Sequence, residues 1–343
     1  MSKLLLTILH MLVLCSSCLN IVDLDEIRQE PLRCMNFYGL ETQRMGLVCD
    51  WQHNFEWYLD RLVENLGINT IRLPFSYELY KYHSLDLMDK FVAACKTRNL
   101  KVILDWHRTW NTHQGPTPEE GITKEEFAKT WIDLLTRYPD AYGVGIFNEL
   151  QGDDTDYAIG LHTYLINQIE KVFPGKFHYF AGCPRWGGDC ANMTLENHPA
   201  WDRIFIEVHK YVFSGKSDVD DWSKSIPSKV SPKHWFVGEV GWKQDVPKER
   251  AWAEMFLTYL NSRNITNLCA WTIAHSGDTE GWWKDDCETF NWEKASLLRS
   301  FWNKNLKGIR LFKPCETPLQ HRLLRPHEKD KSSKADTCTL ELA

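Results

Sequence analysis

The sequence predicts an α/β protein that forms a single-domain (β/α)8 TIM barrel, and three observations support this. Short apolar runs alternate along the chain with longer segments whose apolar residues recur every three or four positions. The short runs are continuously apolar, which is typical of parallel strands buried on both faces. There are eight such runs, which favours a closed barrel over an open sheet.

Each predicted strand is a short apolar run that precedes or follows a helical pattern. In chain order the strands are expected at residues 34–38, 70–73, 102–106, 144–147, 177–181, 204–208, 235–237 and 268–271. The helices are expected at residues 55–65, 85–98, 124–137, 157–172, 250–263 and 294–305. The first helix shows the pattern clearly, because Leu59, Leu62, Val63 and Leu66 share one face. No glycine-rich phosphate loop follows the first strand, which counts against a nucleotide-dependent oxidoreductase.

The first 18 residues have the pattern of a secretory signal peptide. Lys3 supplies a positive charge, residues 4–14 form an apolar run, and Ser16 and Ser17 with Cys18 are small residues suited to cleavage. The apolar run is shorter than the roughly 20 residues that cross a membrane, so we expect no stable membrane insertion. An N-terminal helix packed on the body, or a lipid-modified Cys18, are the alternatives. The first interpretation predicts a secreted, extracellular protein.

Two further domain boundaries follow from composition. Residues 19–312 are expected to form the catalytic barrel, and the polar residues 313–343 a loosely ordered tail. The net charge of −6 provides no basic surplus, so we expect no nucleic-acid partner. The 16 tryptophans could stack on sugar rings, although burial alone explains most aromatic residues. We expect a monomer that acts on a poly- or oligosaccharide.

The cysteines after residue 18 are odd in number, so at least one is free or pairs between chains. Export would place them in an oxidising compartment. Cys183 and Cys190 bracket a short glycine-rich loop and form the expected local disulfide. Cys95 and Cys269 lie in apolar segments and are expected to be buried thiols. No cysteine or histidine cluster has structural zinc spacing, and we predict neither a metal nor a cofactor.

Two glutamates are the most informative residues of the chain. Glu149 and Glu239 each follow a strand-like run directly. A protonated carboxyl group and an ionised one are the minimal apparatus for cleaving a glycosidic bond. The two glutamates would meet that requirement if one of them is protonated and the other ionised.

Other polar residues occupy the remaining strand ends, which form the active-site face of such a barrel. They are Arg72 at the end of the second strand, His107 after the third, Asn148 before Glu149, His209 and Tyr211 after the sixth, and Trp271 at the eighth. Each alone could be structural, for example as half of an ion pair. Their joint placement and order predict a site for a sugar.

With these motifs the chain resembles glycoside hydrolase family 5, within the larger clan of retaining β-glycosidases, from about residue 36 to residue 302. The resemblance implies that Glu149 is the general acid and base and that Glu239 is the nucleophile. It further implies substrate-binding roles for the other residues: Asn148 would hold the sugar 2-hydroxyl, Arg72 and Tyr211 would bond to the nucleophile, His107 and His209 would line the reacting subsite, and Trp271 would be its aromatic floor. The family usually has proline after the acid glutamate, whereas this chain has Leu150.

Two classes of function remain open at this point. The first is a secreted retaining endo-β-glycosidase acting on β-1,4-glucan, with a β-mannanase or another exo- or endo-acting β-glycan hydrolase of the same family as the alternative. The second is a catalytically silent carbohydrate-binding protein on the same barrel. Several loop tryptophans could add sugar subsites or could simply pack: Trp110, Trp186, Trp242, Trp282 and Trp283.

Overall fold

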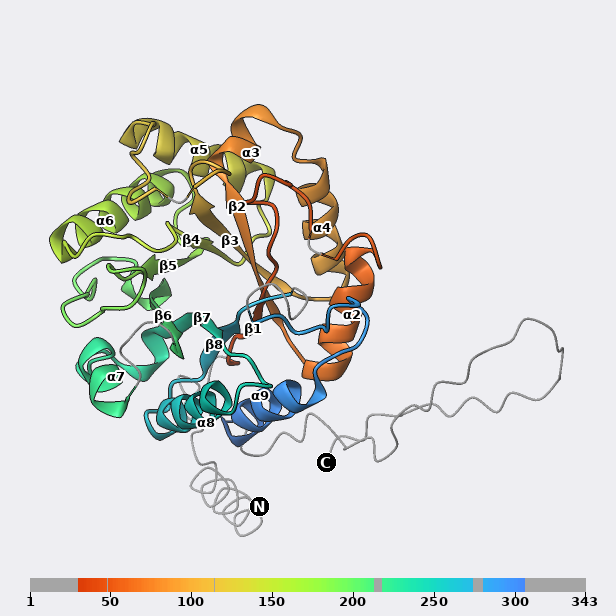
Figure 1. The fold of residues 1–343 in the computed structure, drawn as a ribbon. Coiled ribbons are helices and arrows are strands. Elements are labelled where there is room, and N and C mark those ends of the chain that lie inside the picture. Colours follow the sequence, from red (N-terminus) through yellow and green to blue (C-terminus); the bar gives the residue numbers. More distant parts are fainter. Residues whose placement is uncertain (1–29, 48, 114, 213–217, 274–279, 306–343) are drawn as a thin grey trace, which may run out of the picture. The chain divides into compact units, whose positions relative to one another are not determined.

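The computed structural model describes residues 30–47, 49–113, 115–212, 218–273 and 280–305, and these form a closed barrel of parallel strands in the order β1 to β8. The strands are β1 (Arg33–Asn36), β2 (Thr70–Ser76), β3 (Lys101–Arg108), β4 (Gly143–Gly145), β5 (His178–Gly182), β6 (Ile204–Tyr211), β7 (Trp235–Gly241) and β8 (Asn267–Ala270). Pairing of β1 with β8 closes the ring. Figure 1 shows the strands at the centre with helices around them. The predicted fold class is therefore confirmed.

The helices follow the strands on the outside of the barrel (Figure 1). They are α2 (Phe55–Leu66), α3 (Tyr77–Tyr82), α4 (Asp86–Thr97), α5 (Lys124–Arg137), α6 (Thr155–Val172), α7 (Val219–Ser225), α8 (Pro247–Ser262) and α9 (Trp292–Asn305), with short 3-10 turns η2 (Trp201–Arg203) and η4 (Pro232–His234). Side-chain caps fix several helix starts; Asn54 accepts from the backbone N–H of Trp57, and Thr123 accepts from that of Glu126. The short helices α3 and α7 were not predicted, because neither is long enough to show helical periodicity.

Several strand ends differ from the prediction. Strands β2, β6 and β7 run on to Ser76, Tyr211 and Gly241, whereas β4 already ends at Gly145. The polar residues expected at the ends of the second, sixth and seventh apolar runs are therefore held by strand hydrogen bonds. Such bonds fix a side chain more firmly than a loop does.

The barrel interior has an apolar layer below a polar one. The apolar layer consists of Leu32, Cys34, Ile103, Phe180, Phe205, Phe236 and Cys269. Because side chains on one face of a strand recur every second residue, the next interior positions on four of these strands are Asn36, Asp105, Glu207 and Gly238. The apolar layer supports this polar one from below.

Three disulfides lie in the described residues. Cys183–Cys190 confirms the predicted local bridge, and Cys95 is a buried free thiol as expected. The expectation of a buried thiol at Cys269 is wrong, because Cys269 is bonded to Cys34 across the seam between β1 and β8. The apolar run around Cys269 hid this pairing, since the sequence does not give strand register.

A third bridge, Cys49–Cys287, joins the loops that follow β1 and β8. The described residues all belong to one compact unit. The predicted signal peptide, the polar tail, Cys315 and Cys338 lie outside the described residues. Within the described part of the chain, no helix combines the length and apolarity needed to cross a membrane.

Candidate active site

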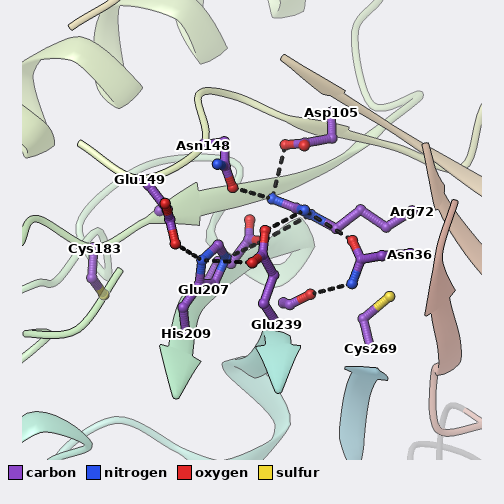
Figure 2. Close-up of polar contacts among 12 residues, drawn as sticks. Asn36, Arg72, Asp105, Asn148, Glu149, Cys183, Glu207, His209, Glu239 and Cys269 are labelled. Carbon is purple, nitrogen blue, oxygen red and sulfur yellow. Dashed lines mark hydrogen bonds and ion pairs between the residues drawn. The ribbon is translucent and has the colours of Figure 1, made fainter. Parts of the chain in front are cut away.

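Arg72 stands at the centre of the polar layer, fully buried on β2. Its Nη1 donates to Oε1 of Glu239 at 3.0 Å and to Oδ1 of Asn36 at 2.9 Å, and its Nη2 donates to Oδ1 of Asn148 at 2.8 Å. Figure 2 shows these groups converging on the guanidinium. One side chain thus ties β1, β7 and the segment after β4 together.

Two more carboxylates complete the surroundings of Arg72. Asp105 on β3 and Glu207 on β6 each lie 3.0 Å from a guanidinium nitrogen. Burial alone would lower the pKa of Arg72, but the carboxylates of Asp105, Glu207 and Glu239 hold it above its ordinary value. A buried arginine is stable here because negative groups surround it.

The two glutamates face each other across His209. An oxygen of Glu149, a ring nitrogen of His209 and an oxygen of Glu239 all lie within 4.8 Å of one another. Glu149 follows β4 with a positive φ of 51° and is 19% exposed in its side chain, whereas the side chain of Glu239 on β7 is 4% exposed. The two carboxyl groups are therefore close enough to act on the same bond.

Glu239 is held on both of its oxygens. Oε1 accepts from Arg72, and Oε2 accepts from the buried Tyr211 hydroxyl at 2.7 Å. Burial raises the pKa of Glu239, as does the nearby Glu149, while His209 and Arg72 oppose the rise. The positive groups thus offset part of the desolvation that would otherwise neutralise the carboxylate.

The surroundings of His209 favour its positively charged form. Its Nδ1 lies 3.1 Å from Oε1 of Glu149 and 3.7 Å from Oε2 of Glu239, and its Nε2 lies 3.2 Å from Oε1 of Glu207. Burial works against the charge, but these carboxylates raise the pKa of His209 to about 10. The spacing of Glu149, His209 and Glu239 would suit a cation, but an imidazolium has no lone pair for a metal, so we assign none.

His107 is instead neutral, because burial lowers its pKa to about 3. Its Nδ1 lies 2.8 Å from Oδ2 of Asp105, and its Nε2 lies 3.4 Å from the Asn148 amide nitrogen. The ring stacks on Trp271 at 5.5 Å between centroids and 14° between planes. Trp271 is 8% exposed, and its carbonyl accepts from Nε1 of Trp282 at 3.2 Å. The indole is therefore fixed on both its ring and its backbone.

The structure brings every predicted site residue into one connected cluster. Sequence reasoning missed Asn36, Asp105 and Glu207, which lie below that cluster. The signal that could have found them is the two-residue period of a strand, because each is a polar residue two positions beyond an apolar interior one. Of the loop tryptophans, Trp186 is exposed, Trp110 is half-buried, and Trp242, Trp282 and Trp283 are buried in the core.

A parallel barrel with two closely spaced glutamates after β4 and on β7 defines a glycoside hydrolase. The chain belongs to the cellulase family, glycosyl hydrolase family 5, since the sequence profile of that family matches residues 28–277. This agrees with the resemblance seen in the strand-end motifs.

Characterised relatives are similar over most of the chain. An endoglucanase of Paenibacillus polymyxa is 25% identical over 81% of this chain and 84% of its own length. The major extracellular endoglucanase of Xanthomonas campestris pv. campestris is 23% identical over 82% of this chain and 69% of its own length.

Solved structures share the fold. An endocellulase variant from Pyrococcus horikoshii in complex with cellotetraose superposes with a TM-score of 0.68 at 20% identity, covering 79% of this chain and 92% of that one. The catalytic domain of the Xanthomonas campestris endoglucanase superposes with a TM-score of 0.67 at 22% identity, covering 80% of this chain and 95% of that one.

Proposed function

We propose that this protein is a secreted, retaining endo-β-glycosidase that hydrolyses β-1,4-glucan by double displacement. The observation that carries the proposal is the separation of Glu149 and Glu239, which have carboxylate oxygens within 4.8 Å of each other. Retaining glycosidases place these groups about 5 to 5.5 Å apart, whereas inverting ones leave space for a water. The endoglucanase relatives and the cellotetraose complex of a structural neighbour support β-1,4-glucan as the substrate.

In the first step Glu239 attacks the anomeric carbon while Glu149 gives its proton to the leaving oxygen. The glycosidic carbon–oxygen bond breaks, and a covalent glycosyl-enzyme forms on Glu239. Glu149, now ionised, takes a proton from a water molecule as that water attacks the same carbon. The bond to Glu239 breaks, the sugar leaves with its original configuration, and Glu149 is protonated again.

The neighbouring side chains support these steps. Arg72 and Tyr211 hold the two oxygens of Glu239 and thereby aim the carboxylate. Asn148 would hold the sugar 2-hydroxyl through its amide nitrogen. His107 and His209 would line the reacting subsite, and Trp271 would form its floor.

The proposal is tested by mass spectrometry of products from cello-, manno-, xylo- and β-1,3-gluco-oligosaccharides, with Glu239→Ala as the inactive variant. Glu170→Gln is the matched control, because Glu170 is also bound by an arginine, Arg203, but lies outside the site. Internal cleavage of the cello series alone, lost in Glu239→Ala and kept in Glu170→Gln, is the expected result. Cleavage of the manno series would change the substrate, and binding without cleavage would establish the silent carbohydrate-binding protein.

Secretion is supported by the signal-like residues 1–18 and by three disulfides, which form and persist in oxidising compartments. Expression of the full chain in a secreting host should deliver active protein to the medium. Its N-terminal sequence should begin after about residue 18. Retention of the intact N-terminus inside the cells would contradict secretion.

A further inference from the structure

Glu207 is a buried carboxylate that takes no direct part in either step of the proposed reaction. It lies on β6, two residues before His209, and is 3% exposed. Its Oε1 is 3.0 Å from Nε of Arg72 and 3.2 Å from Nε2 of His209. Glu207 therefore joins the residue that holds Glu239 to the residue that faces Glu149 (Figure 2).

The main chain beside Glu239 leaves room for this carboxylate. A Cβ atom at Gly238 would lie 1.9 Å from Oε1 and 2.6 Å from Cδ of Glu207. Only glycine at this position allows the close approach of the carboxylate to β7. The location of Glu207 is thus fixed by packing as well as by charge.

The contacts of the His209 ring define its protonation. Both ring nitrogens face carboxylates: Nδ1 faces Glu149, and Nε2 faces Glu207. A neutral imidazole has a single N–H, so one of its nitrogens would direct a lone pair at a carboxylate. Only the doubly protonated ring satisfies both contacts.

We propose that Glu207 is a positioning residue of the active centre, which holds His209 as an imidazolium directed at Glu149 and Glu239. This inference rests on the proposed function, in which those two glutamates carry the reaction. Glu207 does not touch the reacting atoms; it acts through His209.

A fixed positive charge at His209 serves the second step in particular. Once Glu239 is esterified it is neutral, and Glu149 must then be ionised to accept a proton from water. A neighbouring imidazolium favours the ionised form of Glu149. If His209 lost this charge, deglycosylation would become slower, while substrate binding would change less.

Other charged groups also act on His209 and enter the expected titration. Besides Glu149, Glu207 and Glu239, Asp105 on β3 interacts with the ring, and Arg72 on β2 shares Oε1 of Glu207 with it. Burial raises the pKa of Asp105 to about 7, so its charge changes within the range of the experiment. Wild type and Glu207→Gln both contain Asp105 and Arg72, so a difference between their titrations reports on Glu207 alone.

The first experiment follows the His209 ring nitrogens by NMR as a function of pH. His209→Asn assigns the signal among the 13 histidines. In the wild type both ring nitrogens should stay protonated to above about pH 8, and in Glu207→Gln the titration should move down by about one pH unit or more. Glu170→Gln should titrate as the wild type does.

The second experiment measures hydrolysis of 2,4-dinitrophenyl β-cellobioside. Its leaving group needs no proton, so kcat reports the breakdown of the glycosyl-enzyme. Glu207→Gln should lower kcat by roughly tenfold and change KM by less than about threefold. Glu207→Asp, which keeps the charge, should recover part of the loss, whereas Glu170→Gln should behave like the wild type.

Two results would overturn the proposal: a wild-type His209 that titrates near an ordinary value of about 6.5, or an unchanged titration in Glu207→Gln. If Glu207→Gln does not fold, the titration of His209 in the wild type and the kcat of Glu207→Asp test the proposal instead. If the wild type cleaves no glycan while His209 behaves as expected, the contact made by Glu207 stands and the proposed function fails. If the wild type cleaves a glycan but the titration of His209 is unchanged in Glu207→Gln, the proposed function stands and the role of Glu207 fails.

Discussion

Tyr211 donates a 2.7 Å hydrogen bond to Oε2 of Glu239, the carboxylate oxygen that Arg72 leaves open. Strands β6 and β7 pair side by side, so the hydroxyl is brought to the carboxylate by sheet register rather than by a loop. The phenol is buried, and this burial raises the pKa of Tyr211 well above its ordinary value. It therefore remains a hydrogen-bond donor across the whole working range of pH.

Tyr211→Phe should reduce kcat/KM by roughly 10- to 100-fold, because it removes a hydrogen bond to a charged group. The hydroxyl favours ionised Glu239, so its loss should raise the pKa of Glu239 further. Glu239 must be ionised to attack, and the acidic limb of kcat/KM should therefore move to higher pH. The pH profile on a cello-oligosaccharide measures both effects. Tyr179→Phe, which removes a hydroxyl bonded to Glu170, is the control, and an unmoved acidic limb in Tyr211→Phe would contradict the assignment.

Cys34–Cys269 closes the barrel covalently at the seam between its first and last strands. In the unfolded chain Cys49–Cys287 already joins nearby points, so the additional loop that Cys34–Cys269 closes is about 30 residues. Such a loop corresponds to roughly 3 to 4 kcal/mol of chain entropy. The double variant Cys34→Ala with Cys269→Ala should lose about that much free energy of unfolding in urea titrations. An unchanged midpoint would show that the seam needs no covalent bond.

Some features of the barrel and its site could be predicted from the sequence, and others could not. Strand-end residues such as Glu149 could be found because a parallel sheet gathers its carboxyl ends at one edge, whatever the register. Pairings that depend on register could not be found, and Cys269 with Cys34 is the clearest case. Their bond requires two strands 235 residues apart in sequence to align residue for residue.

The polar layer below the glutamates was missed for a related reason. Asp105 and Glu207 lie inside runs that read as continuously apolar strands, where a single acid looks like a surface position. Only the closed barrel shows that their side chains point inward to Arg72. Interior direction is a property of the closed sheet, and the linear pattern does not define it.

The Cys183–Cys190 disulfide closes a short loop beside the active site. Within this loop the backbone N–H of Trp186 donates to the carbonyl of Leu150, next to Glu149, at 2.9 Å. A Cβ atom at Gly187 would lie 2.8 Å from Cγ of His209, so the loop also packs on that ring. The bridge closes a sequence separation of only 7 residues. It therefore supports the position of Glu149 and His209 more than it stabilises the whole fold.

Cys183→Ser with Cys190→Ser should thus lower kcat by roughly tenfold or more, since small displacements of reacting groups are costly. The loss of free energy of unfolding should be smaller than in the Cys34 and Cys269 variant, because the closed loop is shorter. Kinetics and urea unfolding of the two double variants, measured together, provide the comparison. Equal loss of activity in both would count against a local role for the Cys183–Cys190 loop.

Lys294 offers a prediction for the pH dependence of stability. It lies near the start of α9, 1% exposed, with Nζ 4.8 Å from the ring centroid of Trp242 and 4.9 Å from that of Trp282. Its ammonium group also donates to the Glu280 carbonyl. Burial lowers the pKa of Lys294 to about 7, whereas the unfolded chain keeps an ordinary lysine pKa of 10.5. Between those two values the unfolded state binds more protons than the folded state.

The free energy of unfolding should therefore gain a contribution from Lys294 as pH rises from about 7 to about 10. Below pH 7 both states are protonated, and the folded state bears the full cost of burying the charge. Lys294→Met removes this titration. The free energy of unfolding of the wild type should therefore rise relative to that of the variant by on the order of 4 kcal/mol between low and high pH. Urea unfolding at pH 6 and pH 9.5 measures the difference. Lys129→Met, at an exposed lysine paired with Asp133, should show no comparable trend. A gap between wild type and Lys294→Met that is independent of pH would mean that Lys294 keeps an ordinary pKa in the folded barrel.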